Sequence, residues 1–352
     1  MPRKQHRSGT TAAIAAGLAA LLLPGCAAAS AAGPQALDQV NIGYFPNLTH
    51  APGLIADADG KFTQRFGKLN VKVNTKSFNA GPDVIQAILS GSLDISYIGP
   101  NPTVTAYIQS HSDGIRVIAG STSGGASLVV KPGITSVDQL RGKKLATPQL
   151  GNTQDIALRY WLKDKGLNAT QDGGGDVSIQ PQQNSAAVQA FTAGSIDGAW
   201  VPEPFATRLV KAGGTVLVDE KTLWPDGEFV TTNVIARTAF VQQHPDAVRA
   251  FIEAHLDALE EIKADPAAAQ AATAAQIKRI TEQELPADVL QASWANLTFT
   301  ADPLAATLKT SADHAAAVGL LPDKPSDGFA KLWDVTALNE ALAARGQQKI
   351  TA

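Results

Sequence analysis

The chain has 352 residues, 44% of them hydrophobic, and its 29 Lys and Arg against 32 Asp and Glu give a formal net charge of −3. This length is generous for one core and suits two lobes. The slight acidity and the absence of a Lys/Arg-rich run argue against nucleic acid as a partner. The sequence lacks His-Glu-x-x-His, Cys/His clusters, a P-loop and Gly-x-Ser-x-Gly, so we expect no metal, no cofactor and no catalytic residue.

The N-terminus has the charge layout of a secretory signal. Three basic residues lie within the first seven positions and precede an apolar run over 11–23, which is too short to span a bilayer. The run ends in LPGC, which is similar to a bacterial lipobox and contains Cys26, the single cysteine of the chain. We therefore predict a lipoprotein signal peptide over 1–25, a lipid on Cys26, and a tether over 26–37 at the outer face of the cytoplasmic membrane.

Short apolar strands alternate with helices in the first part of the remaining chain. We expect strands over 39–44, 69–73, 93–98 and 117–119, and helices that begin at Ala51 and Pro82. Proline in the first helical turn and Gly60 at a helix end are favourable in those positions. The alternation predicts an α/β fold with doubly wound, mainly parallel sheets.

The second part repeats this alternation. We expect strands over 144–147 and 177–179, and helices over 154–165, 185–191 and 205–211. Segments 120–130 and 230–236 are interpreted as the two crossings between lobes. Residues 38–125 plus 229–352 would form lobe 1 and residues 126–228 lobe 2. The Ala-rich helices beyond residue 245 are expected to pack on lobe 1.

One segment recurs at a constant offset. Residues 87–98 (AILSGSLDISYI) reappear in kind as 190–201 (AFTAGSIDGAWV), 103 positions later and without a gap. Each copy has the pattern of a helix end, a Gly-Ser turn, a short buried strand and a proline-marked loop. A period of about 100 residues suits a small lobe rather than a solenoid repeat. The repeat therefore predicts two similar lobes with a cleft between them.

Six loops at strand ends and helix N-termini form the candidate binding site, because these junctions meet at one edge of a parallel sheet. The candidate ligand-binding residues are Tyr44, Asn47, Leu48, Thr49, His50, Phe78, Asn79, Gly81, Tyr97, Gly99, Asn101, Gly151, Asn152, Thr153, Asn184, Trp200 and Glu203. None of these loops contains Lys or Arg, so backbone N–H groups and neutral side chains would bind a small anion. The alternative is that Asn152, Thr153 and Ser185 are ordinary N-caps.

The aromatic residues of these loops and one acid have two interpretations each. Tyr44, Phe45, Phe78, Tyr97 and Trp200 could form apolar walls around an organic tail, or belong to the core. Glu203 could meet a ligand ammonium group, or sit in the first turn of a helix and favour its dipole.

Three motifs carry a resemblance to a known family: GYFPNLTHAP at 43–52, TPQLGNT at 147–153 and GAWVPEP at 198–204. With the turn at 91–96 they resemble the nitrate/sulfonate/taurine group of substrate-binding lipoproteins of ABC importers, in the NMT1/THI5-like superfamily. The resemblance covers nearly all of 38–345. It implies a type II periplasmic-binding-protein fold with two crossover strands and closure around one small molecule.

The resemblance implies a monomeric receptor that captures an organic anion, most similar to an aliphatic sulfonate binder, and delivers it to a permease with its ATPase. Taurine stays open as the ligand, because taurine-type members have an acid at the position of Glu203 that contacts the amine. Nitrate and pyrimidine or riboflavin-type ligands are further alternatives. An enzyme on the same scaffold, or a surface sensor or adhesin, is the competing class of function.

Overall fold

The computed structural model describes residues 36–321, 325 and 327–352, and these form one compact unit that begins at Ala36. The predicted signal peptide, Cys26 and most of the predicted tether lie outside the described residues. Within the described part, no helix combines the length and the apolar character that a bilayer crossing requires.

The first sheet has six strands in the order β11-β4-β10-β3-β1-β2. Its strands are β1 (Gln39–Tyr44), β2 (Lys72–Ser77), β3 (Ile95–Ile98), β4 (Ile115–Gly124), β10 (Val230–Arg237) and β11 (Leu297–Phe299). β1 is parallel to β2 and β3, whereas β10 is antiparallel to both β3 and β4. The returning strand β10 therefore separates two strands that run in the same direction.

The second sheet has five strands in the order β7-β6-β8-β5-β9. They are β5 (Ala126–Val130), β6 (Lys144–Thr147), β7 (Ser178–Pro181), β8 (Gly198–Pro202) and β9 (Thr215–Asp219). Here β5 is the antiparallel strand between β8 and β9. Each sheet thus contains one antiparallel strand that crosses from the other lobe, and this strand has the equivalent position in both sheets. The predicted mixed α/β class is confirmed. The lobe boundaries stay a prediction, with which the strand membership agrees.

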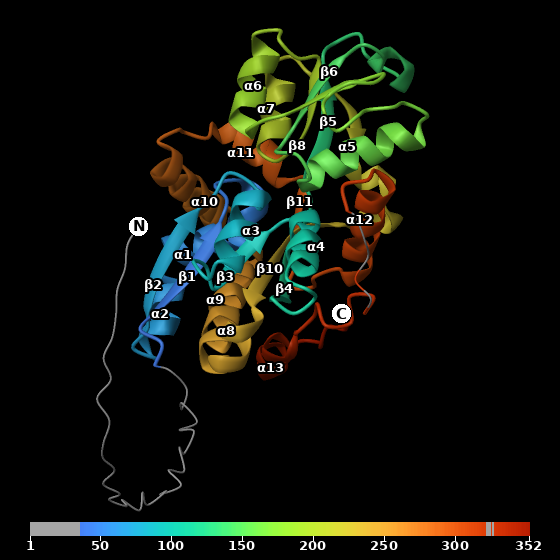
Figure 1. The fold of residues 1–352 in the computed structure, drawn as a ribbon. Helices are drawn as coiled ribbons and strands as arrows, with labels where there is room; N and C mark the ends of the chain where they lie inside the picture. Colours follow the sequence, from blue (N-terminus) through green and yellow to red (C-terminus); the bar gives the residue numbers. More distant parts are fainter. Residues whose placement is uncertain (1–35, 322–324, 326) are drawn as a thin grey trace, which may run out of the picture. The chain divides into compact units, whose positions relative to one another are not determined.

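Helices cover both faces of each sheet (Figure 1). Those of the first half are η1 (Leu48–His50), α1 (Ala51–Ala58), α2 (Lys61–Gly67), α3 (Gly81–Leu89), α4 (Pro100–Gln109), η2 (Val137–Leu140), α5 (Thr153–Asp164) and α6 (Asn184–Thr192). The others are α7 (Phe205–Lys211), η3 (Glu220–Leu223), η4 (Pro225–Gly227), α8 (Thr238–Gln243), α9 (Pro245–Ala264), α10 (Pro266–Thr281), α11 (Ala287–Trp294), α12 (Ala305–Ala317) and α13 (Thr336–Ala344). The strand expected at 69–73 begins three residues later, since Lys72 opens β2.

The repeat has the same local geometry in both copies. Gly91 and Gly194 have φ angles of 78° and 79°, which favour glycine. The carboxylate of Asp94 accepts from the backbone N–H of Asn41 at 2.8 Å, and that of Asp197 accepts from Lys144 at 2.9 Å. Asn41 and Lys144 are again 103 positions apart, so each Asp ties the repeat to the equivalent strand of its own sheet, β1 or β6.

The C-terminal helices do not pack on lobe 1 alone, which corrects the expectation. α11 packs against α7, and α12 packs against both α4 and α5. Lys211 pairs with Asp288 at 2.6 Å, and the rings of Tyr160 and His314 stack with centroids 3.6 Å apart. Composition could not show this, because an Ala-rich helix packs closely on many surfaces. The segment after β10 therefore connects the two lobes a third time (Figure 1).

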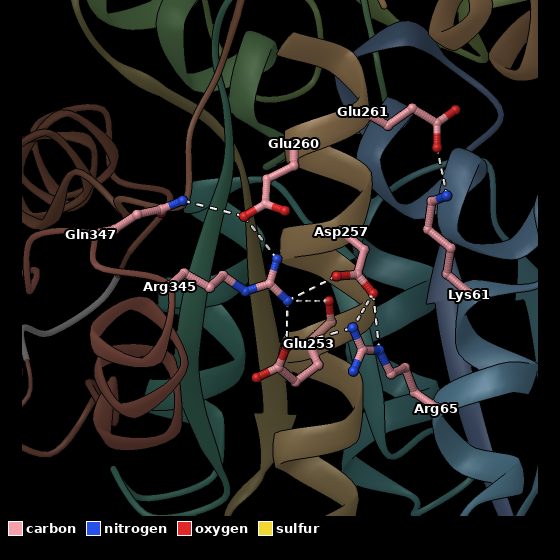
Figure 2. A network of polar contacts seen from close by, with 8 residues as sticks. All are labelled: Lys61, Arg65, Glu253, Asp257, Glu260, Glu261, Arg345 and Gln347. Carbon is pink, nitrogen blue, oxygen red and sulfur yellow. Dashed lines mark hydrogen bonds and ion pairs between the residues drawn. The ribbon is translucent and has the colours of Figure 1, made fainter. Parts of the chain in front are cut away.

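An ion-pair network fixes the end of the chain to α9 (Figure 2). Arg345 lies 2.9 Å from Asp257 and also pairs with Glu253, while Arg65 of α2 lies 2.6 Å from the other oxygen of Asp257. The carboxylates of α9 raise the pKa of Arg345 above its usual range, against the opposing effect of its partial burial. The network therefore holds α2 and the C-terminal segment on the same helix.

Candidate functional site

A small polar cavity lies where strand ends of both sheets meet. Its volume is about 20 Å³, enough for roughly one water-sized group. The lining residues are Phe45, Asn47, Thr49, His50, Asn79, Gly99, Pro148, Asn152, Thr153, Gln154, Asn184, Pro202 and Thr231. Eight of the predicted site residues are therefore brought together here, from loops of both halves of the chain: Asn47, Thr49, His50, Asn79, Gly99, Asn152, Thr153 and Asn184.

Three of these side chains have their acceptor atoms occupied by the protein. Asn47 Oδ1 accepts from Thr49 Oγ1 at 2.8 Å, and Asn152 Oδ1 accepts from the backbone N–H of Thr153 at 2.9 Å. His50 Nδ1 accepts from the backbone N–H of Phe45 at 3.1 Å. The groups left over are donors: the two amide NH₂ groups and the His50 Nε2–H. This set suits an oxyanion.

His50 is a neutral donor at ordinary pH. The residue is 2% exposed, and burial lowers the pKa of its imidazole to about 3. Because Nδ1 accepts a hydrogen bond, the single proton of the neutral ring is assigned to Nε2. His50 therefore contributes a hydrogen bond but no positive charge to the cavity.

Two buried polar atoms in the cavity lining have no hydrogen-bond partner among the described residues. They are Thr153 Oγ1 and Asn184 Oδ1. An unpaired buried polar group costs about 1–3 kcal/mol, so such groups indicate a missing partner. The first of them lies against the other half of the molecule: a Cβ built on Gly99 would be 2.3 Å from Thr153 Oγ1. Any larger residue there would have to displace the Thr153 side chain, so the glycine permits this close approach of the two lobes.

The helix N-termini at the site carry few side-chain caps. α3, α4 and α6 begin without a capping side chain, whereas Asn152 accepts at the start of α5. Asn152 is thus an N-cap as well as a cavity residue, while Thr153 and Ser185 lie inside the first helical turns. Uncapped N–H groups and the positive end of the helix dipole favour negative charge.

A larger cavity of about 310 Å³ adjoins the polar one and shares Phe45, Asn47, Asn79 and Asn184 with it. The remaining lining residues are Pro46, Ser77, Phe78, Gln183, Ser185, Pro204, Phe205, Arg208, Ile277, Ile280, Thr281, Gln283 and Leu285. Phe78 therefore lies at the site as expected. The aromatic and aliphatic part of this lining can hold the organic part of a ligand.

Three predicted wall residues lie in the core instead, and the expectation that they line the cleft is wrong. The Tyr44 hydroxyl donates to Asp57 at 2.7 Å, the Tyr97 hydroxyl lies 2.9 Å from His255 Nδ1, and Trp200 Nε1 donates to Glu220 at 2.8 Å. All three side chains are at most 2% exposed. Burial and the Asp57 carboxylate raise the pKa of Tyr44 to about 12. Their polar atoms are satisfied within each lobe, so they act in packing.

Four further candidates lie outside both cavity linings. Leu48 is fully buried in the core of the first sheet. Asn101 donates to the backbone oxygen of Ser311 at 2.9 Å and so fixes α4 to α12. Gly81 packs against Pro102, where a Cβ would come within 2.1 Å, and Gly151 has a φ of 76° in the turn before α5. These residues shape the loops without lining the cavities.

Glu203 also lies outside the lining, and its carboxylate is engaged. One oxygen accepts from Thr207 Oγ1 at 2.9 Å and from Asn296 Nδ2 at 2.7 Å, and the other accepts from the backbone N–H of Thr207 at 3.0 Å. The side chain is 2% exposed. Glu203 therefore joins the start of α7 to the segment before β11, and its expected contact with a ligand ammonium has no support in this geometry.

The sequence reasoning missed the contributions of α7 and α10. Phe205 and Arg208 follow the Pro204 loop within one helical turn, so the position of that loop in the sequence could have indicated them as site residues. Ile277 and Ile280 belong to α10, and nothing local marks them as cavity residues. Among the described residues, no group of His, Cys, Asp or Glu has the arrangement of a metal site.

Comparison with known proteins agrees with this geometry. Residues 33–278 match the model of the NMT1-like family. The taurine-binding periplasmic protein of Escherichia coli (strain K12) is 29% identical over 227 residues, which are 64% of this chain and 68% of that protein.

Two solved structures share the fold. The alkanesulfonate-binding protein SsuA from Xanthomonas axonopodis pv. citri, bound to MOPS, has a TM-score of 0.68 at 21% identity and covers 84% of this chain and 96% of its own. The periplasmic nitrate-binding protein NrtA from Synechocystis PCC 6803 has a TM-score of 0.72 at 18% identity, with 89% and 90% covered. The expected periplasmic-binding-protein fold is confirmed, and the chain belongs to the NMT1-like family.

Proposed function

We propose that this protein is the extracytoplasmic solute-binding receptor of an ABC importer and that it captures a small organic anion, an aliphatic sulfonate, between its lobes. One observation carries the proposal: the acceptors of Asn47, His50 and Asn152 are occupied internally, so the polar cavity offers mainly donors. A sulfonate head group presents acceptors only and stays anionic at ordinary pH, which matches this set.

The two cavities together favour a head group with an organic tail. The polar cavity of about 20 Å³ has room for about one oxygen, so the rest of the ligand must occupy the neighbouring 310 Å³. Phe45, Phe78 and Phe205 supply apolar surface there. Nitrate would leave that surface without a partner, and this favours a sulfonate over the smaller anion.

Capture is coupled to closure because the polar cavity draws on both lobes. The backbone N–H of Leu48 donates to the backbone oxygen of Glu203 at 3.3 Å, and Gly99 meets Thr153 across the same boundary. A ligand bonded to both sides stabilises the closed arrangement more than the open one, and this difference in contacts drives closure.

The cellular setting follows from the family and from the N-terminal sequence. The lipobox-like LPGC would place a lipid on Cys26 and keep the receptor at the outer face of the cytoplasmic membrane, beside a permease and its ATPase. We expect a monomer that performs no reaction. Turnover of a bound sulfonate would overturn this part of the proposal and favour an enzyme on the same scaffold.

Thermal unfolding against a ligand panel tests the proposal. A true ligand at ~100 times its dissociation constant adds ~2.7 kcal/mol of stability, which raises the melting temperature by a few degrees. We expect alkanesulfonates to do so and nitrate to have a smaller effect. If no sulfonate shifts the transition, the proposed ligand class is wrong.

Two threonine variants locate the binding. Thr153→Val removes the unpaired hydroxyl in the cavity and should weaken sulfonate binding about tenfold, since one hydrogen bond is lost. Thr232→Val is the matched control, because the Thr232 hydroxyl is also buried and unpaired among the described residues but lies outside both linings. Equal effects of the two substitutions would place the ligand elsewhere.

A further inference from the structure

The described lining of the larger cavity carries a positive charge and no negative one. Its described lining contains no Asp and no Glu, and its one ionised side chain is that of Arg208 on α7. The organic part of a ligand would therefore meet a cation. This charge lies beside a polar cavity that is lined by neutral groups, mainly donors, with Asn184 Oδ1 as an unpaired acceptor, so the two ends of a ligand experience different environments.

Arg208 has no carboxylate partner within the part of the chain that the structure describes. Its guanidinium lies 6.0 Å from the ring centroid of Phe205, and Nη2 donates to the backbone oxygen of Glu284 at a long 3.4 Å. Burial lowers the pKa of the group, yet an arginine remains protonated in proteins. A half-buried cation without a counter-ion loses hydration that no ion pair replaces.

Three acids near this cavity have other partners, and the exposed Glu282 lies outside its lining. The Glu284 carboxylate pairs with Lys278 at 2.5 Å, and Asp288 pairs with Lys211 at 2.6 Å. Glu203 accepts hydrogen bonds from Thr207 and Asn296. A ligand ammonium would therefore find no free carboxylate in this cavity and would face Arg208, whereas a ligand carboxylate would supply the missing counter-charge.

We propose that the ligand is a sulfonate with a second acidic group, whose carboxylate pairs with Arg208 in the larger cavity. The inference rests on the proposed function, since it assigns the opposite end of the same ligand. Phe205 would pack against the connecting carbons, and Ser185 and Gln283 can donate to the carboxylate. Taurine, with an ammonium at that end, is disfavoured.

Three ligands of matched length separate the contributions of the terminal group. They are 3-sulfopropanoate, propane-1-sulfonate and taurine, which end in a carboxylate, a methyl and an ammonium group. Calorimetric titration of the full chain should find 3-sulfopropanoate about tenfold tighter than propane-1-sulfonate, with taurine the weakest. Added salt should reduce the first affinity more than the second.

Arg208→Gln should remove the preference for the carboxylate and leave propane-1-sulfonate within about twofold of its original affinity. Lys165→Gln is the control, because it also removes one positive charge from the second lobe but from an exposed side chain that lies outside the cavity. The melting temperature of each unliganded variant verifies folding. Tighter binding of taurine than of 3-sulfopropanoate, or an equal loss for all three ligands on Arg208→Gln, would overturn the inference and leave the proposed function standing. Binding of none of the three would remove both.

Discussion

The five strands of the second lobe follow the same arrangement as five of the six strands of the first, but the two lobes bury different ionisable groups. The first lobe contains His50 and His255, whose pKa values burial lowers to about 3 and about 4. The second contains Glu220, whose pKa burial raises to about 7. Equivalent topology therefore does not fix the electrostatics of a core, because each sheet packs its own side chains around the same backbone arrangement.

These shifts give the lobes opposite pH dependence. A histidine with a lowered pKa binds its proton more readily in the unfolded chain, so the first lobe loses stability as the pH falls from 6.5 toward 3. A glutamic acid with a raised pKa releases its proton more readily when unfolded. The second lobe therefore loses stability as the pH rises from 4.5 to about 7.

The largest effect is expected in the first lobe from His255→Leu. His255 bridges the Tyr97 hydroxyl and the Gly120 carbonyl, each at 2.9 Å, and the substitution leaves both unpaired. Unfolding in urea should show a loss of about 4 kcal/mol at pH 7. Tyr97→Phe, which breaks one of these bonds, should lose clearly less. Equal losses would show that the bridge is not the source of the stability.

Glu220→Gln should remove the pH dependence of the second lobe. The glutamine oxygen still accepts from Trp200 Nε1, but the side chain no longer ionises. The variant should match the original protein near pH 4.5 and exceed it by about 3 kcal/mol above pH 7. Urea unfolding across this range measures the difference. The exposed Glu228→Gln serves as the control, and a similar gain there would contradict the assignment.

The repeat permits a comparison of Asp94→Ala with Asp197→Ala. Asp94 is 5% exposed, accepts from Asn41 and pairs with Arg237 at 2.5 Å, whereas Asp197 is half-buried and accepts from Lys144. We expect a loss of about 2 kcal/mol for the first and under about 1 kcal/mol for the second. Hydrogen exchange should show each loss in its own lobe. A larger loss for Asp197→Ala than for Asp94→Ala would mean that the ion pair with Arg237 does not stabilise the first lobe.

A similarly small effect should follow Arg345→Met, which keeps the aliphatic stem and removes the charge from the network on α9 (Figure 2). We expect a loss of about 1 kcal/mol that shrinks in 1 M salt, because the pairs are partly exposed. Exchange of backbone amides should increase in α13. An unchanged melting temperature at low salt would show that packing alone holds this segment.

Local sequence patterns were sufficient to predict the strands and many of the residues that line the polar cavity. Helix N-termini after parallel strands converge for geometric reasons, and this brought Asn47, Asn79, Gly99 and Asn152 to one cavity. The prediction of aromatic walls was wrong for Tyr44, Tyr97 and Trp200, and for Tyr44 the period of the strand already contained the answer. Val40, Ile42 and Tyr44 alternate with the intervening residues and share one face of β1, so Tyr44 belongs to the same core as the other two.

The remaining parts depend on contacts between distant segments. α10 and the segment after it supply Ile277, Ile280, Thr281, Gln283 and Leu285 to a cavity whose other walls come from residues 45–208. The role of Glu203 likewise depends on Asn296, almost a hundred positions later. No local period or motif encodes such a meeting. The loop sequences therefore predicted the residues at the head-group end of the site. The residues at its other end could be identified only from the structure.

The bridging contacts of α11 and α12 limit how freely the lobes can move. Besides the two crossings of the chain, Lys211 with Asp288 and Tyr160 with His314 join the lobes at separate places. A wide swing would have to break both contacts at once, whereas a small rotation could keep them. Release of a ligand by a wide opening would then require these outer contacts to break together with those at the cavity, so residues that never touch the ligand would contribute to its residence time.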